Sequence, residues 1–289
     1  MSASHFWRYP QWPHLELRRV EDGREVHYAP HSHKQWSLGA ITHGISTFQY
    51  RDDHYDISEG DLVLMNPEWV HSCNPVDNQP WAYWMLYVDS DWLTQLRIEL
   101  GLQTDAQWRD IHTAVVTESA SKASPYNWYQ LYCDMAAALT DPQAETLEKQ
   151  SLFVDFMALL MEYLDQQQGA TKQPSNSSDS SALDDVASYL DRALAETPTL
   201  EDLIELASCS EGHLIRSFRR RYGLTPHAYL LNRRIQKSQE LLRNGCDIAE
   251  VAQQLAFADQ AHFQRTFKKL TATTPGQYQL NARVAPKEQ

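Results

Sequence analysis

A weak internal duplication in residues 183–281 constrains the fold more than any other feature of the sequence. The stretch His-Leu-Ile-Arg-Ser-Phe-Arg-Arg, which begins at His213, aligns with His-Phe-Gln-Arg-Thr-Phe-Lys-Lys, which begins at His262. The same offset pairs Thr225 with Thr274, Pro226 with Pro275 and Tyr229 with Tyr278. A register kept over this length is not expected by chance, so the segment is predicted to contain two copies of one supersecondary unit.

Each copy has the pattern of a helix-turn-helix. The four predicted helices span 200–207, 211–222, 248–255 and 260–270. Their N-cap positions hold Thr199, Ser210, Asp247 and Asp259, all residue types that accept a hydrogen bond from the first turn. Thr199 and Asp247 are each followed three positions later by an acidic residue, which resembles a capping box. Two helices joined by such a short turn are typical of DNA-binding units.

The second helix of each copy has one apolar and one basic face. The apolar residues Leu214 and Phe218, like Phe263 and Phe267, are four positions apart and should face the core. The opposite faces carry Arg216, Arg219, Arg220, Gln264, Arg265, Lys268 and Lys269. Arginine bridges guanine, glutamine bridges adenine, and both lysine and arginine neutralise phosphates. One basic helix is usually only a solvated surface, but two in duplicated frames favour double-stranded DNA as the partner.

A longer helix is predicted between the copies, over 226–243. Thr225 caps it, Pro226 occupies its first turn and Gly245 follows its end. Eighteen residues at about 1.5 Å each give a rod of roughly 27 Å. Such a rod would hold two DNA-reading helices about 34 Å apart, one turn of the duplex.

Residues 183–281 resemble the tandem helix-turn-helix domain of the AraC/XylS family of bacterial transcription regulators. The matching stretches begin at Leu200, His213, Gly223, Arg233, Ile248, Phe257 and Thr274. The resemblance implies that Gly212, Arg216, Gln260, Ala261, Gln264 and Arg265 face promoter DNA. With the other exposed residues of the second helices, the predicted DNA-binding residues are Gly212, His213, Arg216, Arg219, Arg220, Gln260, Ala261, Gln264, Arg265, Lys268 and Lys269. Ser208 and Ala256 stand where the family usually has turn glycines. Gly212 and Ala261 offer no hydrogen-bonding side chain, so readout there would rest on methyl contact or shape.

Charge is distributed unevenly between the two halves of the chain. The net charge is -13, which alone would argue against nucleic acid. Residues 183–289 hold 14 basic and 13 acidic residues, whereas the preceding part holds 11 basic and 25 acidic ones. Residues 211–269 alone hold 11 basic and 5 acidic residues. The C-terminal half therefore permits DNA binding despite the acidic total.

The N-terminal half changes from strands to helices near residue 90. Short segments rich in aromatic and β-branched residues up to about residue 89 indicate a sandwich or barrel. The expected fold class is α+β, with a cupin-like β-barrel (jelly roll), then helices, then an all-α tandem helix-turn-helix domain. The expected divisions are a barrel over 1–90, a helical dimerisation or packing segment over 91–168, a flexible Ser/Gln-rich linker over 166–181, the DNA-binding domain over 182–281 and a tail over 282–289.

An apolar stripe in the predicted helix over 146–166 has two interpretations. Its members are Leu152, Phe156, Leu159, Leu160, Tyr163 and Leu164. The stripe either packs against the β-domain or forms a helix-helix contact in a homodimer, because a stripe alone does not name its partner.

Three histidines lie in motifs that resemble degenerate cupin motifs, the barrel commonly found upstream of this DNA-binding domain. They are His31 and His33 of a His-x-His pair and the later His71, and Gly44 stands where the first motif expects glycine. A metal-binding cupin also needs a carboxylate, but Ser37 or Leu38 occupies that position. We therefore expect no metal and no cofactor, although these histidines are the only metal candidates.

Three roles remain open for the histidines: hydrogen bonding in turns, lining of an effector pocket, and a metal centre. We favour the pocket, because the surrounding residues would make a mostly apolar barrel interior with a few polar groups. The predicted effector-binding residues are His31, His33, Trp36, Phe48, Tyr50, Met65, Trp69, His71 and Trp84. They would suit a small polar ligand such as a sugar, or an amine through cation–π contact.

The sequence thus predicts a DNA-binding transcription regulator controlled by a small-molecule effector, and not an enzyme. It has no secretory signal and no apolar run of the roughly 20 residues that a membrane span needs, so a cytoplasmic location without membrane contact is expected. A homodimer and a contact with RNA polymerase fit this role. The alternatives are a metal-dependent cupin enzyme tethered to a DNA-binding domain and a DNA-binding dimer without effector.

Overall fold

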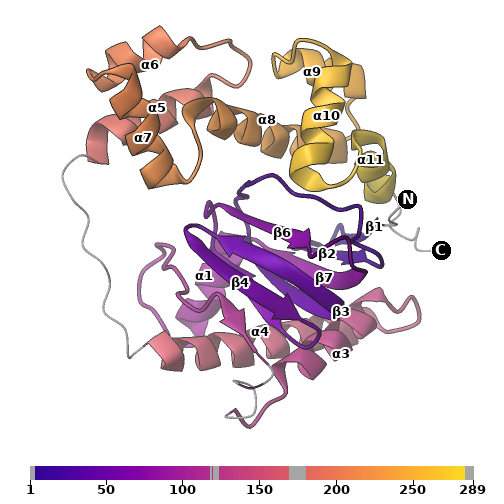
Figure 1. Ribbon diagram of the computed structural model, residues 1–289. Coiled ribbons are helices and arrows are strands. Elements are labelled where there is room, and N and C mark those ends of the chain that lie inside the picture. Colours follow the sequence, from indigo (N-terminus) through magenta and orange to yellow (C-terminus); the bar gives the residue numbers. More distant parts are fainter. Residues whose placement is uncertain (1–3, 118, 120–123, 169–179, 284–289) are drawn as a thin grey trace.

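The computed structural model describes residues 4–117, 119, 124–168 and 180–283. An antiparallel sheet occupies the centre of Figure 1, with helices α3 and α4 along one side and helices α5 to α11 over the other. A sheet-rich N-terminal part is followed by helices and then by an all-helical C-terminal part, which confirms the predicted α+β class.

The sheet is organised around its longest strand, β3. The strands are β1 Ser4–Tyr9, β2 Trp12–Val20, β3 Trp36–Tyr50, β4 Asp53–Ser58, β5 Leu62–Met65, β6 His71–Pro75, β7 Trp81–Val88 and β8 Val115–Val116. Their order is β1-β2-β7-β3-β5-β8, and every pairing is antiparallel. The first half of β3 pairs with β5 and β7, whereas its second half pairs with β4 and β6. One strand thereby belongs to both layers of a folded-over sheet.

Gly44 lies where β3 passes from one layer to the other. Its φ is +75°, in the left-handed region that favours glycine. A Cβ atom at this position would stand 2.1 Å from the carbonyl oxygen of Pro80. The position therefore requires glycine both for its backbone angle and for the close approach of a neighbouring chain.

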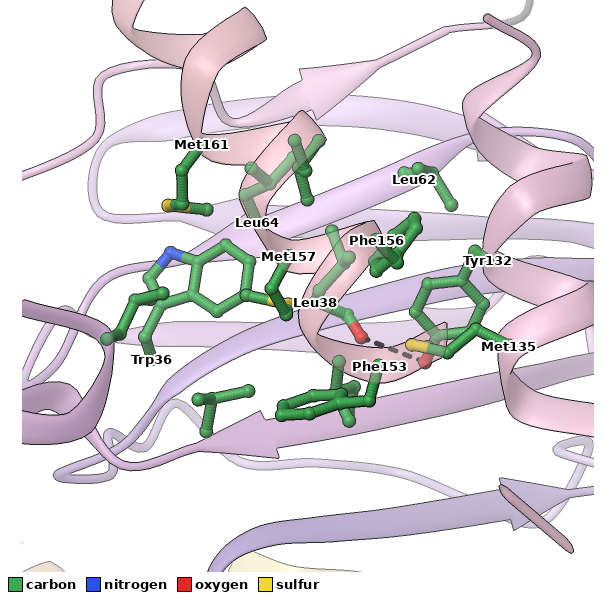
Figure 2. Packing of buried hydrophobic residues seen from close by; sticks show 14 of the residues in the cluster. Trp36, Leu38, Leu62, Leu64, Tyr132, Met135, Phe153, Phe156, Met157 and Met161 are labelled. Carbon is green, nitrogen blue, oxygen red and sulfur yellow. Dashed lines mark hydrogen bonds between the residues drawn. The ribbon is translucent and has the colours of Figure 1, made fainter. Parts of the chain in front are cut away.

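Alternate residues of β3 enter two different cores, because successive side chains of a strand point to opposite faces. Trp36, Leu38 and Ala40 pack with the helical layer, in a cluster shared with α3 (Trp128–Thr140) and α4 (Thr146–Gln168). Figure 2 shows this cluster, in which Tyr132 donates a hydrogen bond to the carbonyl oxygen of Leu38 (3.2 Å). Ile41, by contrast, belongs to the core between the two sheet layers.

The apolar stripe of α4 packs against this sheet core. Phe156, Leu160 and Leu164 are buried in the cluster, and Leu159 and Tyr163 are partly buried against it. Leu152 is an exception, because 40% of its surface is exposed, and Leu147 is 71% exposed. The first interpretation of the stripe, packing against the β-domain, is therefore what the structure shows for most of its members.

The C-terminal helices follow the predicted boundaries closely. They are α5 Ser180–Arg192, α6 Leu200–Ala207, α7 Glu211–Tyr222, α8 Pro226–Arg243, α9 Ile248–Gln254, α10 Gln260–Thr271 and α11 Pro275–Arg283, and the short α1 Ser90–Glu99 follows the sheet. The predicted capping interactions form at Thr199, Thr225, Asp247 and Asp259, with a full capping box at Thr199. Ser210 occupies its N-cap position but makes no side-chain cap hydrogen bond there.

The turn residues Ser208 and Ala256 both adopt left-handed conformations, with φ of 48° and 50°. The family's preference for glycine at these positions thus has a local reason in this chain, because a Cβ atom is unfavourable in that region.

The linker predicted over 166–181 overlaps both flanking helices. Residues 166–168 are the last residues of α4, residues 180–181 are the first of α5, and 169–179 lie outside the described residues. Likewise, residues 282–283 of the predicted tail belong to α11, and 284–289 lie outside the described part. Within the described ranges, no helix combines the length and the hydropathy that a membrane crossing requires.

Candidate functional site

Helices α7 and α10 are the second helices of the two copies, and we call them the recognition helices. Leu214, Phe218, Phe263 and Phe267 are completely buried on their inner faces, as predicted. The predicted DNA-contact residues with exposed side chains are His213, Arg216, Arg219, Arg220, Gln260, Ala261, Gln264, Arg265, Lys268 and Lys269. Gly212 lies in the first turn of α7. Both recognition helices therefore present polar and mainly basic faces to solvent.

Arg234 of the connecting helix α8 is a buried residue that bonds to segments on both sides of this helix, and it was not among the predicted site residues. Its side chain is 6% exposed and donates to the carbonyl oxygens of Leu194 (3.0 Å), Ala256 (3.2 Å) and Glu196. Leu194 and Glu196 follow α5, whereas Ala256 is the turn residue of the second copy. A basic residue on the buried side of an amphipathic helix was the sequence signal that marked this role.

The three predicted histidines lie close together in the sheet domain. The ring centroids of His31 and His33 lie 4.6 and 4.7 Å from that of His71, and 6.5 Å from each other. Two backbone hydrogen bonds link His31 with His71, in both directions. The structure therefore places the His-x-His pair and the distant histidine next to one another.

All three histidines are held in one hydrogen-bonding arrangement. Each Nδ1 atom lies 2.8–2.9 Å from a main-chain carbonyl oxygen, of Ala29, Gln35 or Trp69. A neutral imidazole with its Nδ1–H donated in this way keeps Nε2 as an acceptor. Burial lowers the pKa of His31 and of His33 to about 4 and holds the pKa of His71 well below its usual value, and the neighbouring imidazoles lower those of His31 and His71 further. The rings are therefore neutral at pH 7.

A metal site would need more than these three rings. Among the residues that the structure describes, no group of three or more His, Cys, Asp or Glu side chains has the arrangement needed to hold a metal ion. Ser37, at one of the two positions where a metal-binding cupin would carry a carboxylate, instead lies with its hydroxyl 3.3 Å from Nε2 of His33. The cluster can accept hydrogen bonds from a bound molecule, and this is the chemistry it offers.

A small apolar pocket with about 20 Å³ of free space continues from the histidines into the space between the sheet layers. Four predicted effector residues line it: His31, His33, Met65 and His71. The other lining residues are Tyr28, Gly39, Ile41, Val63, Cys73, Trp81, Tyr83, Met85 and Tyr87. We call this space the barrel pocket.

The remaining predicted effector residues lie elsewhere. Phe48, Tyr50 and Trp69 belong to the same core but do not line the barrel pocket. Trp36 and Trp84 lie on the opposite face of the sheet, among the residues packed under the helices. The reason is the two-residue period of a strand, which sends even-numbered residues of β7 to the helices and Trp81, Tyr83, Met85 and Tyr87 to the pocket. That alternation was the available sequence signal for the four residues of β7 that the prediction missed.

A second, larger cavity of about 370 Å³ lies between the sheet and helix α8. The sheet side contributes Glu16, Arg18, Tyr28, His31, His33 and Tyr87 among others, and α8 contributes Asn232, Arg233, Gln236 and Arg243 among others. Tyr28, His31, His33 and Tyr87 line both this interdomain cavity and the barrel pocket. Four side chains are thus the shared wall of two adjoining spaces.

The segment 28–33 lines the barrel pocket and also contacts the DNA-binding helices. Tyr28, His31 and His33 face the pocket. The residues between them contact the helices: Ala29 N–H donates to the carbonyl oxygen of Lys269 at the end of α10 (3.1 Å). Ser32 receives a hydrogen bond from Asn232 of α8 (3.0 Å). A molecule in the pocket would therefore lie one residue away from contacts that position α8 and α10.

The first recognition helix also touches the sheet at its C-terminal end. Gly223, which ends α7 with φ of +72°, packs so closely on Val70 that a Cβ atom would lie 2.8 Å from a Val70 methyl group. Near it, Arg233 of α8 forms ion pairs with Asp191 (2.6 Å) and with Glu68 of the sheet domain (2.5 Å). The sheet domain thus contacts the C-terminal ends of both recognition helices.

Comparison with protein families assigns both halves of the chain. The model of the AraC-like ligand binding domain matches residues 14–190, which is more than half of the chain. A helix-turn-helix domain model matches residues 203–281. The HTH-type transcriptional regulator YbfI of Bacillus subtilis is 28% identical over 246 residues, 85% of each chain. The HTH-type transcriptional activator RhaR of an Enterobacter species is 26% identical over 236 residues, which is 80% of this chain and 79% of RhaR.

Solved structures of ToxT from Vibrio cholerae share the arrangement of the whole chain. One superposes with a TM-score of 0.56 at 11% identity, covering 98% of both chains. Another, with an unsaturated fatty acid bound, superposes with a TM-score of 0.55 at 12% identity and covers 100% of this chain and 99% of ToxT. At this level of identity the similarity is one of fold.

Proposed function

This chain belongs to the AraC family of DNA-binding transcription regulators, with an N-terminal ligand-binding domain and a C-terminal helix-turn-helix domain, and from that membership we propose how its two domains act together. Both recognition helices enter neighbouring major grooves of promoter DNA, and an effector binds beside the histidines, where the interdomain cavity of about 370 Å³ adjoins the barrel pocket. The segment 28–33 couples binding of the effector to the positions of α8 and α10. The observation that carries this proposal is the double role of that segment, which lines the pocket and contacts the DNA-binding helices.

On the DNA side, the exposed residues of the recognition helices divide by chemistry. Arg216, Arg265 and Gln264 point outward from positions that suit direct contact with base edges, by bidentate hydrogen bonds. The phosphate contacts are assigned to Arg219, Arg220, Lys268 and Lys269, with His213 and Gln260 as further polar contacts. Gly212 and Ala261 then admit close approach of the duplex without specifying a base by hydrogen bonds.

On the effector side, the pocket supplies acceptors and apolar surface. His31, His33 and His71 present neutral rings, and Met65 supplies an apolar wall. The Nε2 atoms of His31 and His71 are the acceptors offered to a ligand, whereas that of His33 lies 3.3 Å from the Ser37 hydroxyl. Phe48, Tyr50, Trp36, Trp69 and Trp84 support the sheet around it from positions that do not line the pocket. This chemistry serves binding, and we assign the chain no catalytic activity, metal or cofactor.

The proposal keeps the domain order expected from the sequence: barrel 1–90, helical segment 91–168, linker 166–181, DNA-binding domain 182–281 and tail 282–289. Residues 166–168, 180–181 and 282–283 are assigned instead to α4, α5 and α11. A homodimer in the cytoplasm would place two tandem units on one promoter, where RNA polymerase is the further partner of a regulator. The exposed Leu147 and Leu152 on the outer side of α4 support a dimer contact there. Replacing both with aspartate is expected to shift the protein from dimer to monomer in sedimentation, whereas an unchanged sedimentation coefficient would move the dimer contact elsewhere.

Selection of bound DNA from a random pool by the full chain tests the proposal. Two enriched sequence blocks about one helical turn apart are expected. Arg216→Ala and Arg265→Ala should each weaken binding to the selected site by about 1–3 kcal/mol and relax preference in one block only. Arg24→Ala is the matched control, since Arg24 is an exposed arginine of the sheet domain paired with Asp22. A pool without sequence bias, or equal losses in the control, would refute the proposed reading of DNA.

A further inference from the structure

A groove with about 470 Å³ of free space lies between the two recognition helices. One wall is the C-terminal half of α7, with Arg219 and the following Gly223, and the other wall is α10. The lining residues of α10 and of the start of α8 are His262, Thr266, Lys269, Leu270, Thr225, Ala228 and Leu231. We call this space the recognition groove, because the helices on its two sides are those that the proposed function places in DNA.

The sheet domain reaches the rim of the recognition groove. Ala29 and Pro30, from the loop between β2 and β3, line the groove together with the helices. Figure 1 shows this loop under α8 and α10. Ala29 N–H donates to the carbonyl oxygen of Lys269 (3.1 Å), and Val70 of the sheet domain packs on Gly223. Contacts with the ends of both recognition helices therefore hold the sheet domain at this rim.

The two sheet-domain residues leave the groove open. Pro30 is exposed and Ala29 carries only a methyl group, so neither side chain fills the space between the helices. A segment that blocked DNA would have to cover the basic residues of the groove, but Arg219 and Lys269 are both exposed in the docked arrangement. The docked sheet domain is thus a side of the groove and does not plug it.

The recognition groove is basic. Arg219 lies on one wall and Lys269 on the other, and the residues of the described ranges that line the groove include no Asp or Glu. Nearby, Arg221 at the end of α7 is paired with Asp184, so its charge is partly balanced within the protein. Exposed cations on two facing walls, without an acidic residue in the lining, are complementary to a polyanion.

The shape of duplex DNA identifies the part that would occupy this groove. Helices that read two successive major grooves on one face of a duplex leave one minor groove between them. Two sugar-phosphate backbones border that minor groove, and their phosphates carry the negative charge of the duplex. The recognition groove lies between α7 and α10, where Arg219 and Lys269 can each meet one of these backbones. Its rim at Ala29 and Pro30 then lies beside the same minor groove.

We propose that Ala29 and Pro30 of the sheet domain belong to the DNA interface and contact the sugar-phosphate backbone at the minor groove between the two sequence blocks. The inference rests on the proposed function, which places α7 and α10 in neighbouring major grooves. Uncharged, small side chains suit contact with the backbone, which positions the protein without reading bases. Pro30 directly precedes His31, so an effector beside the histidines lies next to a residue that touches DNA.

Charge at position 30 tests this contact in the full chain. Pro30→Lys should tighten binding to the selected site roughly threefold to tenfold and steepen the slope of log K against log salt by about 1, because it adds one phosphate contact. Pro30→Glu should weaken binding by a similar factor. Pro13 provides the matched control, because it is an exposed proline of strand β2 beside α1, where His14 stacks on Trp92. Changes of the same sign in both Pro30 variants, or changes no larger than those of Pro13→Lys and Pro13→Glu, would overturn the proposal.

Tethered cleavage locates the contact without relying on affinity. An iron–EDTA group attached to Pro30→Cys, bound to the selected site, is expected to cut both strands at the minor groove between the two blocks. The chain has four cysteines of its own, so the unmodified chain treated with the same reagent gives the background. Pro13→Cys should add no cleavage to it. Cleavage by Pro30→Cys that does not exceed this background at the central minor groove would overturn the proposal.

DNA selection with the unmodified chain separates this inference from the proposed function. A chain that selects two sequence blocks but shows neither the opposite charge effects nor the central cleavage would refute this inference and leave the proposed function standing. A chain that binds no specific DNA would refute the proposed function, and this inference with it.

Discussion

Ser32 and Asn232, which are 200 residues apart in the sequence, are joined by two hydrogen bonds across the domain boundary. Ser32 N–H donates to Oδ1 of Asn232 (3.3 Å), and Nδ2 of Asn232 donates to the hydroxyl of Ser32 (3.0 Å). Both residues are buried, and the neighbouring Gln236 donates to the carbonyl oxygen of Ser32 (2.8 Å). The pair fixes the pocket segment to the helix that connects the two DNA-binding units.

Asn232→Ala should therefore weaken the contact between the domains. It leaves the buried N–H of Ser32 without a partner and removes the hydrogen bond that the Ser32 hydroxyl accepts, which costs about 1–3 kcal/mol. Hydrogen exchange of segment 28–33 is expected to accelerate, and the urea midpoint should fall. Lys237→Ala, at an exposed ion pair of the same helix, is the control. Unchanged exchange in segment 28–33 would show that the pair does not hold the domains together.

Lys268 and Gln264 of α10 should affect DNA binding in different ways. Lys268→Ala is expected to weaken binding on all sequences about equally and to lower the slope of log K against log salt by about 1. Gln264→Ala is expected to cost about 1–3 kcal/mol on the selected site and little on random DNA. Titrations at several salt concentrations, on both kinds of DNA, measure the difference. A sequence-dependent loss in Lys268→Ala would reverse the two assignments.

Ala256→Gly should stabilise the protein, although it removes a methyl group. Ala256 has φ of 50°, where a Cβ atom is unfavourable by roughly 1–2 kcal/mol, and glycine avoids that strain at some cost in unfolded-state entropy. A net gain of about 0.5–1 kcal/mol in urea unfolding is expected. Ala249→Gly is the matched control, because Ala249 lies exposed in helix α9 and its substitution should destabilise.

Most of the C-terminal fold could be predicted from the sequence because its signals are local. Thr199, Thr225 and Asp247 are capping residues whose partners lie two or three positions away, so short-range chemistry sets the helix boundaries. The bridge between His31 and His71 has no local signal, since it pairs distant segments, and only the resemblance to cupin motifs grouped these histidines.

What the sequence analysis missed depends on contacts between distant segments. Trp36 and Trp84 were assigned to the pocket by their aromatic character, but strand parity places them under the helices. Arg18 is one of many arginines in the sequence, and only its burial against Thr271, 253 residues later, marks it. The interdomain cavity has walls from both halves of the chain, and no pattern in either half describes it.

The histidine cluster should make stability depend on pH near neutrality. Burial lowers the pKa of His31 and of His33 to about 4 in the folded protein and lowers that of His71 well below its usual value. In the unfolded chain these groups titrate near pH 6.5. Above that pH the histidines are neutral in both the folded and the unfolded state, and their burial does not lower the free energy of unfolding through protonation. As pH falls from about 6.5 toward 4, the unfolded chain binds protons at these histidines whereas the folded protein does not. The free energy of unfolding therefore falls.

Each such histidine contributes a slope of at most about 1.4 kcal/mol per pH unit in this window. Urea unfolding of the full chain at about pH 7 and pH 5 measures the slope. His71→Asn should reduce it, because asparagine keeps a donor for the Trp69 carbonyl oxygen and does not titrate. His54→Asn, at an exposed histidine of strand β4, should leave it unchanged. An equal slope in His71→Asn and the unmodified chain would show that the buried imidazole is not the source of the acid sensitivity.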